Sequence, residues 1–155
     1  MILYLDASAL VKRYVAERGS EAVARSLEEA EYVATSVVTR VEVSSALGRA
    51  VRVDALAEDE AASALRLFRS EWARFLRIQA AESVIAAAAR LAWDLGLRAY
   101  DTVQLASALW WSDTLEAEVT FATFDLPLWQ AAGARGLTRS PPDLPATLER
   151  WRRER

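Results

Sequence analysis

Short apolar runs alternate with longer amphipathic stretches along the chain. The runs Ile2–Leu5, Tyr32–Thr35 and Val119–Thr123 predict strands, because they are short, apolar and rich in β-branched or aromatic residues. Leu76–Gln79 predicts a weaker fourth strand. Between these runs, apolar residues recur every three or four positions, which is typical of helices that bury one face.

Helices are expected over residues 8–15, 21–29, 37–51, 57–75, 83–95 and 101–111, and from 125 to about 133 or 136. Ser36 is expected to cap the third of these helices, and Gly96 is expected to end the fifth. Strands that alternate with helices imply a parallel sheet covered on both faces. The sequence therefore predicts an α/β fold, a three-layer α/β/α sandwich with a mainly parallel sheet of four or five strands.

The first 137 residues carry this alternation without an internal repeat or a linker, so residues 1–137 are expected to form one domain. Beyond them, Pro141, Pro142 and Pro145 interrupt regular structure, and a short basic helix is expected to follow as far as Arg155. We therefore assign residues 138–155 to a C-terminal tail.

Composition excludes several kinds of chemistry. The 155 residues include no cysteine and no histidine, which excludes disulfides, thiol nucleophiles, zinc sites built on cysteine and Ser-His-Asp triads. A net charge of −3 is not that of a nonspecific nucleic-acid binder. The most apolar stretch, Val84–Leu95, is broken by Arg90 and Asp94 and is too short to span a bilayer. A cytoplasmic protein without a membrane partner is expected, and any catalysis must use carboxylates, hydroxyls, Lys12, arginines or a bound ion.

Three acids have an ordinary structural interpretation as helix caps. Asp6 and Asp125 each follow an expected strand and precede an expected helix, where aspartate is a preferred N-cap residue. Asp101 begins a segment with capping-box spacing that ends at Gln104. Taken singly, each of these residues is explained by capping.

Glu42 resists that explanation, since helical spacing places it on the same inward-facing line as Val38 and Ala46. An unpaired carboxylate there is costly, unless the face lines a solvated groove. In an open parallel sheet, moreover, the carboxyl ends of the strands share one edge, where Asp6, Glu42, Asp101 and Asp125 can meet. Four carboxylates without histidine suit Mg²⁺ or Mn²⁺ rather than zinc, and they repel one another when no metal is bound.

Four segments resemble the motifs of the PIN domain family, and specifically of the single-domain VapC-type toxin ribonucleases of type II toxin–antitoxin systems. They occur in the family's order within about residues 1–137, at Leu5–Lys12, Thr35–Glu42, Leu97–Ala108 and Phe121–Asp125. By this resemblance, Asp6, Glu42, Asp101 and Asp125 are the catalytic and metal-binding acids. Ser8 and Thr123 match the polar residues near the metal or phosphate. Many relatives carry histidine where this chain has Gln104.

The resemblance implies an endoribonuclease that uses Mg²⁺ or Mn²⁺ to hydrolyse RNA phosphodiester bonds. It also implies a cognate antitoxin that silences the nuclease, held against the helices carrying Val43–Val51 and Leu65–Phe75. A homodimer is expected, formed through the tryptophan-bearing helix Asp101–Trp111 and its neighbours. RNA rather than DNA as substrate rests on the resemblance alone.

Other interpretations stay open at this point. Ser8 alternatively caps the first helix, and Thr123 is an ordinary strand residue. Four basic residues near the motifs either contact phosphates or belong to a solvated charged surface: Lys12, Arg13, Arg40 and Arg98. A phosphatase of the haloacid-dehalogenase kind is disfavoured, because Ser8 stands where its second aspartate is needed. The main alternative is a non-catalytic RNA-binding or regulatory module of the PIN fold, which would not need four acids beside a polyanion.

Overall fold

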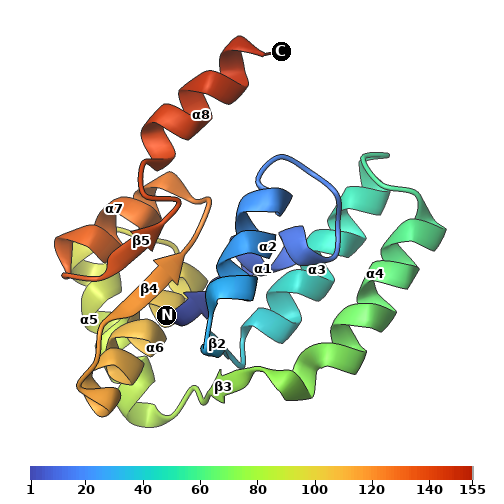
Figure 1. Cartoon of the computed structure of the whole chain (residues 1–155). Helices are drawn as coiled ribbons and strands as arrows, with labels where there is room; N and C mark the ends of the chain where they lie inside the picture. The colour runs from blue at the N-terminus through green and yellow to red at the C-terminus, as the bar shows by residue number, and fades with distance from the viewer. Residues whose placement is uncertain (155) are drawn as a thin grey trace.

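Five strands form one parallel sheet in the computed structural model, which describes residues 1–154. The order is β3-β2-β1-β4-β5 (Figure 1). The strands are β1 (Ile2–Leu5), β2 (Tyr32–Ser36), β3 (Leu76–Ile78), β4 (Val119–Ala122) and β5 (Thr138–Ser140). Tyr4 at the centre of the sheet pairs with Ala34 on one side and with Phe121 on the other. The α/β sandwich with a parallel sheet, predicted from the sequence, is confirmed.

Side chains of the central strand alternate between two cores, as the two-residue period of a strand requires. Leu3 and Leu5 pack into one core and Tyr4 packs into the other, where its ring stacks on Phe121. The first core is covered by α1 (Ala7–Leu10), α2 (Ser20–Glu29), α3 (Thr39–Arg52) and α4 (Glu58–Glu71). The second is covered by α5 (Glu82–Leu95), α6 (Ala99–Leu115) and α7 (Leu126–Ala134). The last helix, α8 (Leu144–Arg153), projects from this body (Figure 1).

Several helix ends differ from the prediction. Ser36 is the last residue of β2 and does not cap α3, because the helix begins three residues later, at Thr39, with Val38 in the N-cap position. The first and fourth predicted helices end in 3₁₀ turns, η1 (Val11–Arg13) and η2 (Trp72–Arg74). Helix α6 is longer than expected at both ends. Its segment 102–108 is buried on every side, so the sequence lacks the alternation of polar and apolar faces that would mark the ends of the helix.

The fifth strand had no sequence pattern to reveal it. Its three residues are polar, and they are held by pairing with β4, with Ser140 opposite Ala122. The division predicted after residue 137 therefore falls between α7 and β5, and the sheet extends into the segment assigned to the tail. Within residues 1–154, no helix combines the length and the apolar character needed to cross a membrane.

A partly buried ion pair joins η1 to α4 on one face of the sheet. The Arg13 guanidinium donates from Nε and Nη2 to the two carboxylate oxygens of Glu71, at 2.7 and 2.8 Å. The Tyr14 hydroxyl donates to Glu71 Oε2 at 3.0 Å. The hydrogen bond from Arg13 is the main reason that the pKa of Glu71 lies below its usual value. Arg13 therefore has a structural role in this fold.

Replacing Glu71 with glutamine should lower the free energy of unfolding at pH 7 by about 1–3 kcal/mol, because the charge-assisted bonds are lost. A lowered folded-state pKa gives stability that is present above the usual glutamate pKa and is lost as the pH falls through the folded-state value. The difference between wild type and variant should therefore shrink below about pH 4. Urea unfolding at pH 7 and pH 3.5 measures it, with the exposed Glu28→Gln as control. An equal difference at both pH values would refute the ion-pair explanation.

Candidate active site

The candidate site lies at the carboxyl edge of the sheet, where the strand order changes direction between β1 and β4. Leu5 pairs with Ala122 at the ends of these strands, and the Asp6 amide donates to the Ala122 carbonyl oxygen at 3.1 Å. Parallel register thus brings the residues after β1 beside those after β4. Asp6 and Thr123 are neighbours for this reason.

Asp6 is 3% exposed, and its carboxylate accepts hydrogen bonds from three neighbouring residues. Its Oδ1 accepts from the Ala9 amide at 2.9 Å, which makes Asp6 the N-cap of α1. Its Oδ2 accepts from Thr123 Oγ1 at 2.7 Å, and the Ser8 hydroxyl lies 2.8 and 3.0 Å from Oδ1 and Oδ2. Burial raises the pKa of Asp6 to about 7 against these bonds, and the negative charge of Glu42 adds to the rise. Capping and membership of the acidic site are therefore both properties of this residue.

Ser8 and Thr123 form hydrogen bonds beyond those expected of a helix cap and an ordinary strand residue. Ser8 is not the cap of α1, and its Oγ accepts from the Phe124 amide at 2.9 Å while it contacts Asp6. Thr123 Oγ1 accepts from the Asp125 amide at 3.1 Å while it donates to Asp6. These two hydroxyls connect the turn after β1 to the turn after β4.

The two remaining aspartates lie nearer the surface. Asp125 caps α7, since its Oδ1 accepts from the Leu128 amide at 2.9 Å. Asp101 lies within the first turn of α6, whose N-cap position is Arg98, so the capping-box interpretation of Asp101 was wrong. Arg98 joins both acids: its Nε donates to Asp101 Oδ2 and its Nη2 donates to Asp125 Oδ2, each at 2.8 Å.

Glu42 on α3 is half-buried and is held by Gln104 of α6. Gln104 is 1% exposed, and its Nε2 donates to Glu42 Oε1 and to Thr39 Oγ1, both at 2.7 Å. Its Oε1 accepts from the buried Tyr4 hydroxyl at 2.7 Å. Gln104 therefore connects the central strand to Glu42. The sequence marked Gln104 only as a departure from relatives, and nothing in it predicted this arrangement.

Electrostatics couple the four acids into one group. The pKa of Glu42 is raised mainly by burial, with a further rise from the charge of Asp101, while Gln104 and Arg98 oppose the change. Asp6 is coupled to Glu42 in the same way, and Asp101 and Asp125 share Arg98. Among residues 1–154, no three acids stand at the spacing of a metal-binding group. The all-oxygen donor set, with buried acids of raised pKa, nevertheless fits a hard divalent cation.

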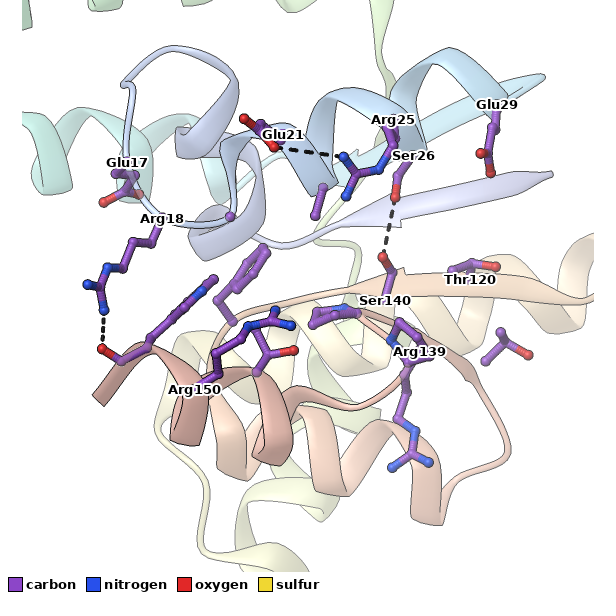
Figure 2. A pocket seen from close by; sticks show the side chains of 18 of the residues that line it. Glu17, Arg18, Glu21, Arg25, Ser26, Glu29, Thr120, Arg139, Ser140 and Arg150 are labelled. Atoms are coloured by element: carbon purple, nitrogen blue, oxygen red, sulfur yellow. Dashed lines mark hydrogen bonds and ion pairs between the residues drawn. The ribbon is translucent and has the colours of Figure 1, made fainter. Parts of the chain in front are cut away.

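A separate cleft of about 920 Å³ opens between α2 and α8 (Figure 2). Arginines and glutamates line it in equal number, namely Arg18, Arg25, Arg139, Arg150, Glu17, Glu21, Glu29 and Glu154. Arg25 lies 4.0 Å from Glu21, and Arg18 donates to the Trp151 carbonyl oxygen. The cleft approaches the acidic edge at Phe124, which stacks on Trp151 at a ring distance of 5.9 Å, and at Ser140, whose carbonyl oxygen accepts from the Thr123 amide at 3.0 Å. None of the four acids lines it.

Comparison with known proteins agrees with this geometry, because the PIN domain model matches residues 3–130, which include all four acids. The chain belongs to the PIN domain family. Ribonuclease VapC45 of Mycobacterium tuberculosis (strain CDC 1551 / Oshkosh) is 33% identical over 143 residues, 92% of this chain and 97% of that protein.

Two solved structures share the fold. PAE2754 from Pyrobaculum aerophilum has a TM-score of 0.62 at 20% identity, with 96% of each chain covered. A chain of a toxin-antitoxin complex from Klebsiella pneumoniae has a TM-score of 0.52 at 17% identity, with 77% of this PIN domain protein and 84% of that chain covered.

Asp6→Asn should leave the fold intact, because an asparagine oxygen can still cap α1. A raised folded-state pKa means that wild type loses stability as the pH rises from the usual aspartate value towards 7, whereas the variant carries no such charge. With EDTA present, the melting temperature of Asp6→Asn minus that of wild type should therefore increase from pH 5.5 to pH 8. A large loss of melting temperature at pH 8 would show that the carboxylate acts mainly as a structural cap.

Gln104→Leu should destabilise the protein by about 2–4 kcal/mol, since it leaves the Tyr4 hydroxyl and Glu42 without their buried partner. It should also raise the pKa of Glu42 further, because the hydrogen bond that lowers it is lost. Chemical denaturation gives the first effect and NMR titration of the Glu42 carboxyl carbon gives the second. Gln104→His can keep one N–H directed at Glu42 and should recover part of both. Equal behaviour of the leucine and histidine variants would contradict a positioning role.

Proposed function

We propose that this chain is a metal-dependent endoribonuclease and the toxin of a toxin–antitoxin pair. The observation that carries the proposal is a series of pairwise contacts that links the four carboxylates. The charge of Glu42 acts on the buried Asp6, the charge of Asp101 acts on Glu42, and Arg98 bridges Asp101 and Asp125. A PIN domain relative named as a ribonuclease, covered over 97% of its length, supports the nuclease activity. A binding-only module would gain nothing from acids that repel its polyanionic ligand.

Asp6, Glu42, Asp101 and Asp125 would hold Mg²⁺ or Mn²⁺. When bound there, the ion supplies a Lewis acid that activates water and stabilises charge on the attacked phosphate. Ser8 and Thr123 hold Asp6 in place, and Gln104 holds Glu42. Water as the nucleophile breaks the bond between phosphorus and the 3′ oxygen, so the products carry 5′-phosphate and 3′-hydroxyl ends.

An antitoxin and a second copy of the chain are the proposed partners. A toxin-antitoxin complex with this fold supports the first. Exposed apolar side chains on the proposed groove helices, Val41 of α3 and Leu67 of α4, suit a protein partner. For the homodimer, α6 offers Trp110, since its Trp111 is buried, and the neighbouring α5 offers the exposed Trp93.

The test is cleavage of structured and unstructured RNA with Mg²⁺, with Mn²⁺ and with EDTA, followed by analysis of the product ends. Cleavage should require the metal, leave 5′-phosphate ends and spare single-stranded DNA of the same sequence. Asp101→Asn should lower the rate at least a hundredfold, as loss of a charge-stabilising group does. Failure of wild type to cut any RNA with either metal, combined with retained RNA binding, would favour the non-catalytic module.

A further inference from the structure

Arg98 is the one cation that the structure places on two acids of the candidate site, among the residues it describes. It occupies the N-cap position of α6 with an extended backbone, so its side chain leaves the helix towards the turn after β4. Its Nε and Nη2 contact different acids, Asp101 and Asp125, through one oxygen of each at 2.8 Å. Arg98 thus forms a bridge between α6 and α7 at the two acids that lie nearer the surface.

The bridge is built so that it can be displaced. The Arg98 side chain is 77% exposed, whereas those of Asp101 and Asp125 are 13% and 23% exposed. An ion pair with a solvated guanidinium is weak, and releasing it returns the arginine to water at little cost. The Asp125 carboxylate stays in place when it leaves, because its Oδ1 caps α7, and the backbone of Asp101 stays within the first turn of α6.

A divalent cation and the Arg98 guanidinium compete for the same carboxylates. A Mg²⁺ or Mn²⁺ ion takes carboxylate oxygens at about 2.1 Å, which puts it beside any guanidinium bonded to those carboxylates. Two positive charges so close repel each other, so metal binding and the Arg98 bridge oppose each other. The cation and the guanidinium each stabilise the charges of Asp101 and Asp125, so binding of one weakens binding of the other.

We propose that Arg98 is a built-in counter-ion that holds Asp101 and Asp125 until a divalent ion displaces it, and that it thereby sets the metal affinity of the site. This inference rests on the proposed function, because it assumes that these acids bind a metal. In the metal-free protein Arg98 relieves the repulsion between the acids, and in the metal-bound protein it is released to the surface. Arg98 is thus a positioning residue that acts through two acids.

The test is calorimetric titration of MnCl₂ into the full chain, prepared free of metal, for wild type, Arg98→Gln and Arg40→Gln. Arg40 is an exposed arginine two positions before Glu42, and it forms no ion pair with an acid of the site. Arg40→Gln therefore removes the same charge as Arg98→Gln without breaking the bridge. Arg98→Gln should bind Mn²⁺ about tenfold more tightly than wild type, which is about 1.4 kcal/mol. Arg40→Gln should stay within about twofold. Arg98→Lys, whose ammonium reaches one carboxylate at a time, should lie between the two.

A second readout needs no metal. In EDTA, Arg98→Gln should melt below wild type because the bridge between α6 and α7 is lost, and its gain in melting temperature on adding MnCl₂ should exceed that of wild type. Mn²⁺ affinity in Arg98→Gln that equals or falls below that of wild type would overturn the proposal. An equal gain in Arg40→Gln would also overturn it, as an effect of net charge alone.

Asp6→Asn separates this inference from the function on which it rests. Loss of Mn²⁺ binding in Asp6→Asn, with wild-type affinity in Arg98→Gln, refutes the role of Arg98 and leaves the metal site standing. Equal Mn²⁺ binding by wild type and Asp6→Asn refutes the metal site at these acids, and the role of Arg98 with it.

Discussion

The burial of carboxylates at one edge of the sheet, with added repulsion between neighbouring acids, is the constraint on which the candidate site depends. Parallel strands bring their carboxyl ends together, so residues that follow β1 and β4 become neighbours whatever their charge. The chain contains no histidine and a single lysine, Lys12, which pairs with Glu17. The donors to the acids are instead two hydroxyls, two helix backbone amides, the side-chain amide of Gln104 and the guanidinium of Arg98.

These donors divide the site into two halves of different character. The deep half contains Asp6 and Glu42, which are held by buried partners from three elements of the fold, Thr123, Ser8 and Gln104. Moving those acids would break several buried or partly buried hydrogen bonds, which is costly. The shallow half contains Asp101 and Asp125, whose charges meet an exposed guanidinium. Rigid positioning and exchangeable charge are thus assigned to different acids.

How far the sequence could predict this site follows from the range of the interactions. The strands follow from local hydrophobic runs and were foreseen. The rule for parallel sheets predicts that the four acids converge, and the structure links them in pairs while, among residues 1–154, no three acids form a metal-binding group. Helix capping is also local, but for Asp6 and Asp125 the capping interpretation and the interpretation as acids of the candidate site do not exclude each other. A carboxylate has two oxygens, and in each residue one oxygen accepts from a helix amide while the other faces the site.

The features that were missed depend on distant partners. The Tyr4–Gln104 bond joins residues 100 positions apart, and β5 exists only because β4 lies beside it. Likewise, Arg98 could be seen as a basic residue near a motif, but its contact with Asp125 depends on how α6 meets the turn after β4. Arg13 looked equivalent to Arg98 in sequence, yet the fold directs it to Glu71 and away from the acids. Only tertiary packing distinguishes an arginine that stabilises the core from one that neutralises the site.

The division of the donors between the two halves also explains how the folded protein accommodates four acids at one edge of the sheet. With the deep acids stabilised by dipoles and one arginine shared by the shallow pair, the folded state needs no cluster of lysines nearby to remain stable. Dipoles fixed by the fold keep their orientation when a cation arrives, whereas an exposed guanidinium can leave. The architecture therefore keeps the geometry of the deep half constant and confines the proposed exchange of charge to the exposed Arg98, beside the partly exposed Asp101 and Asp125.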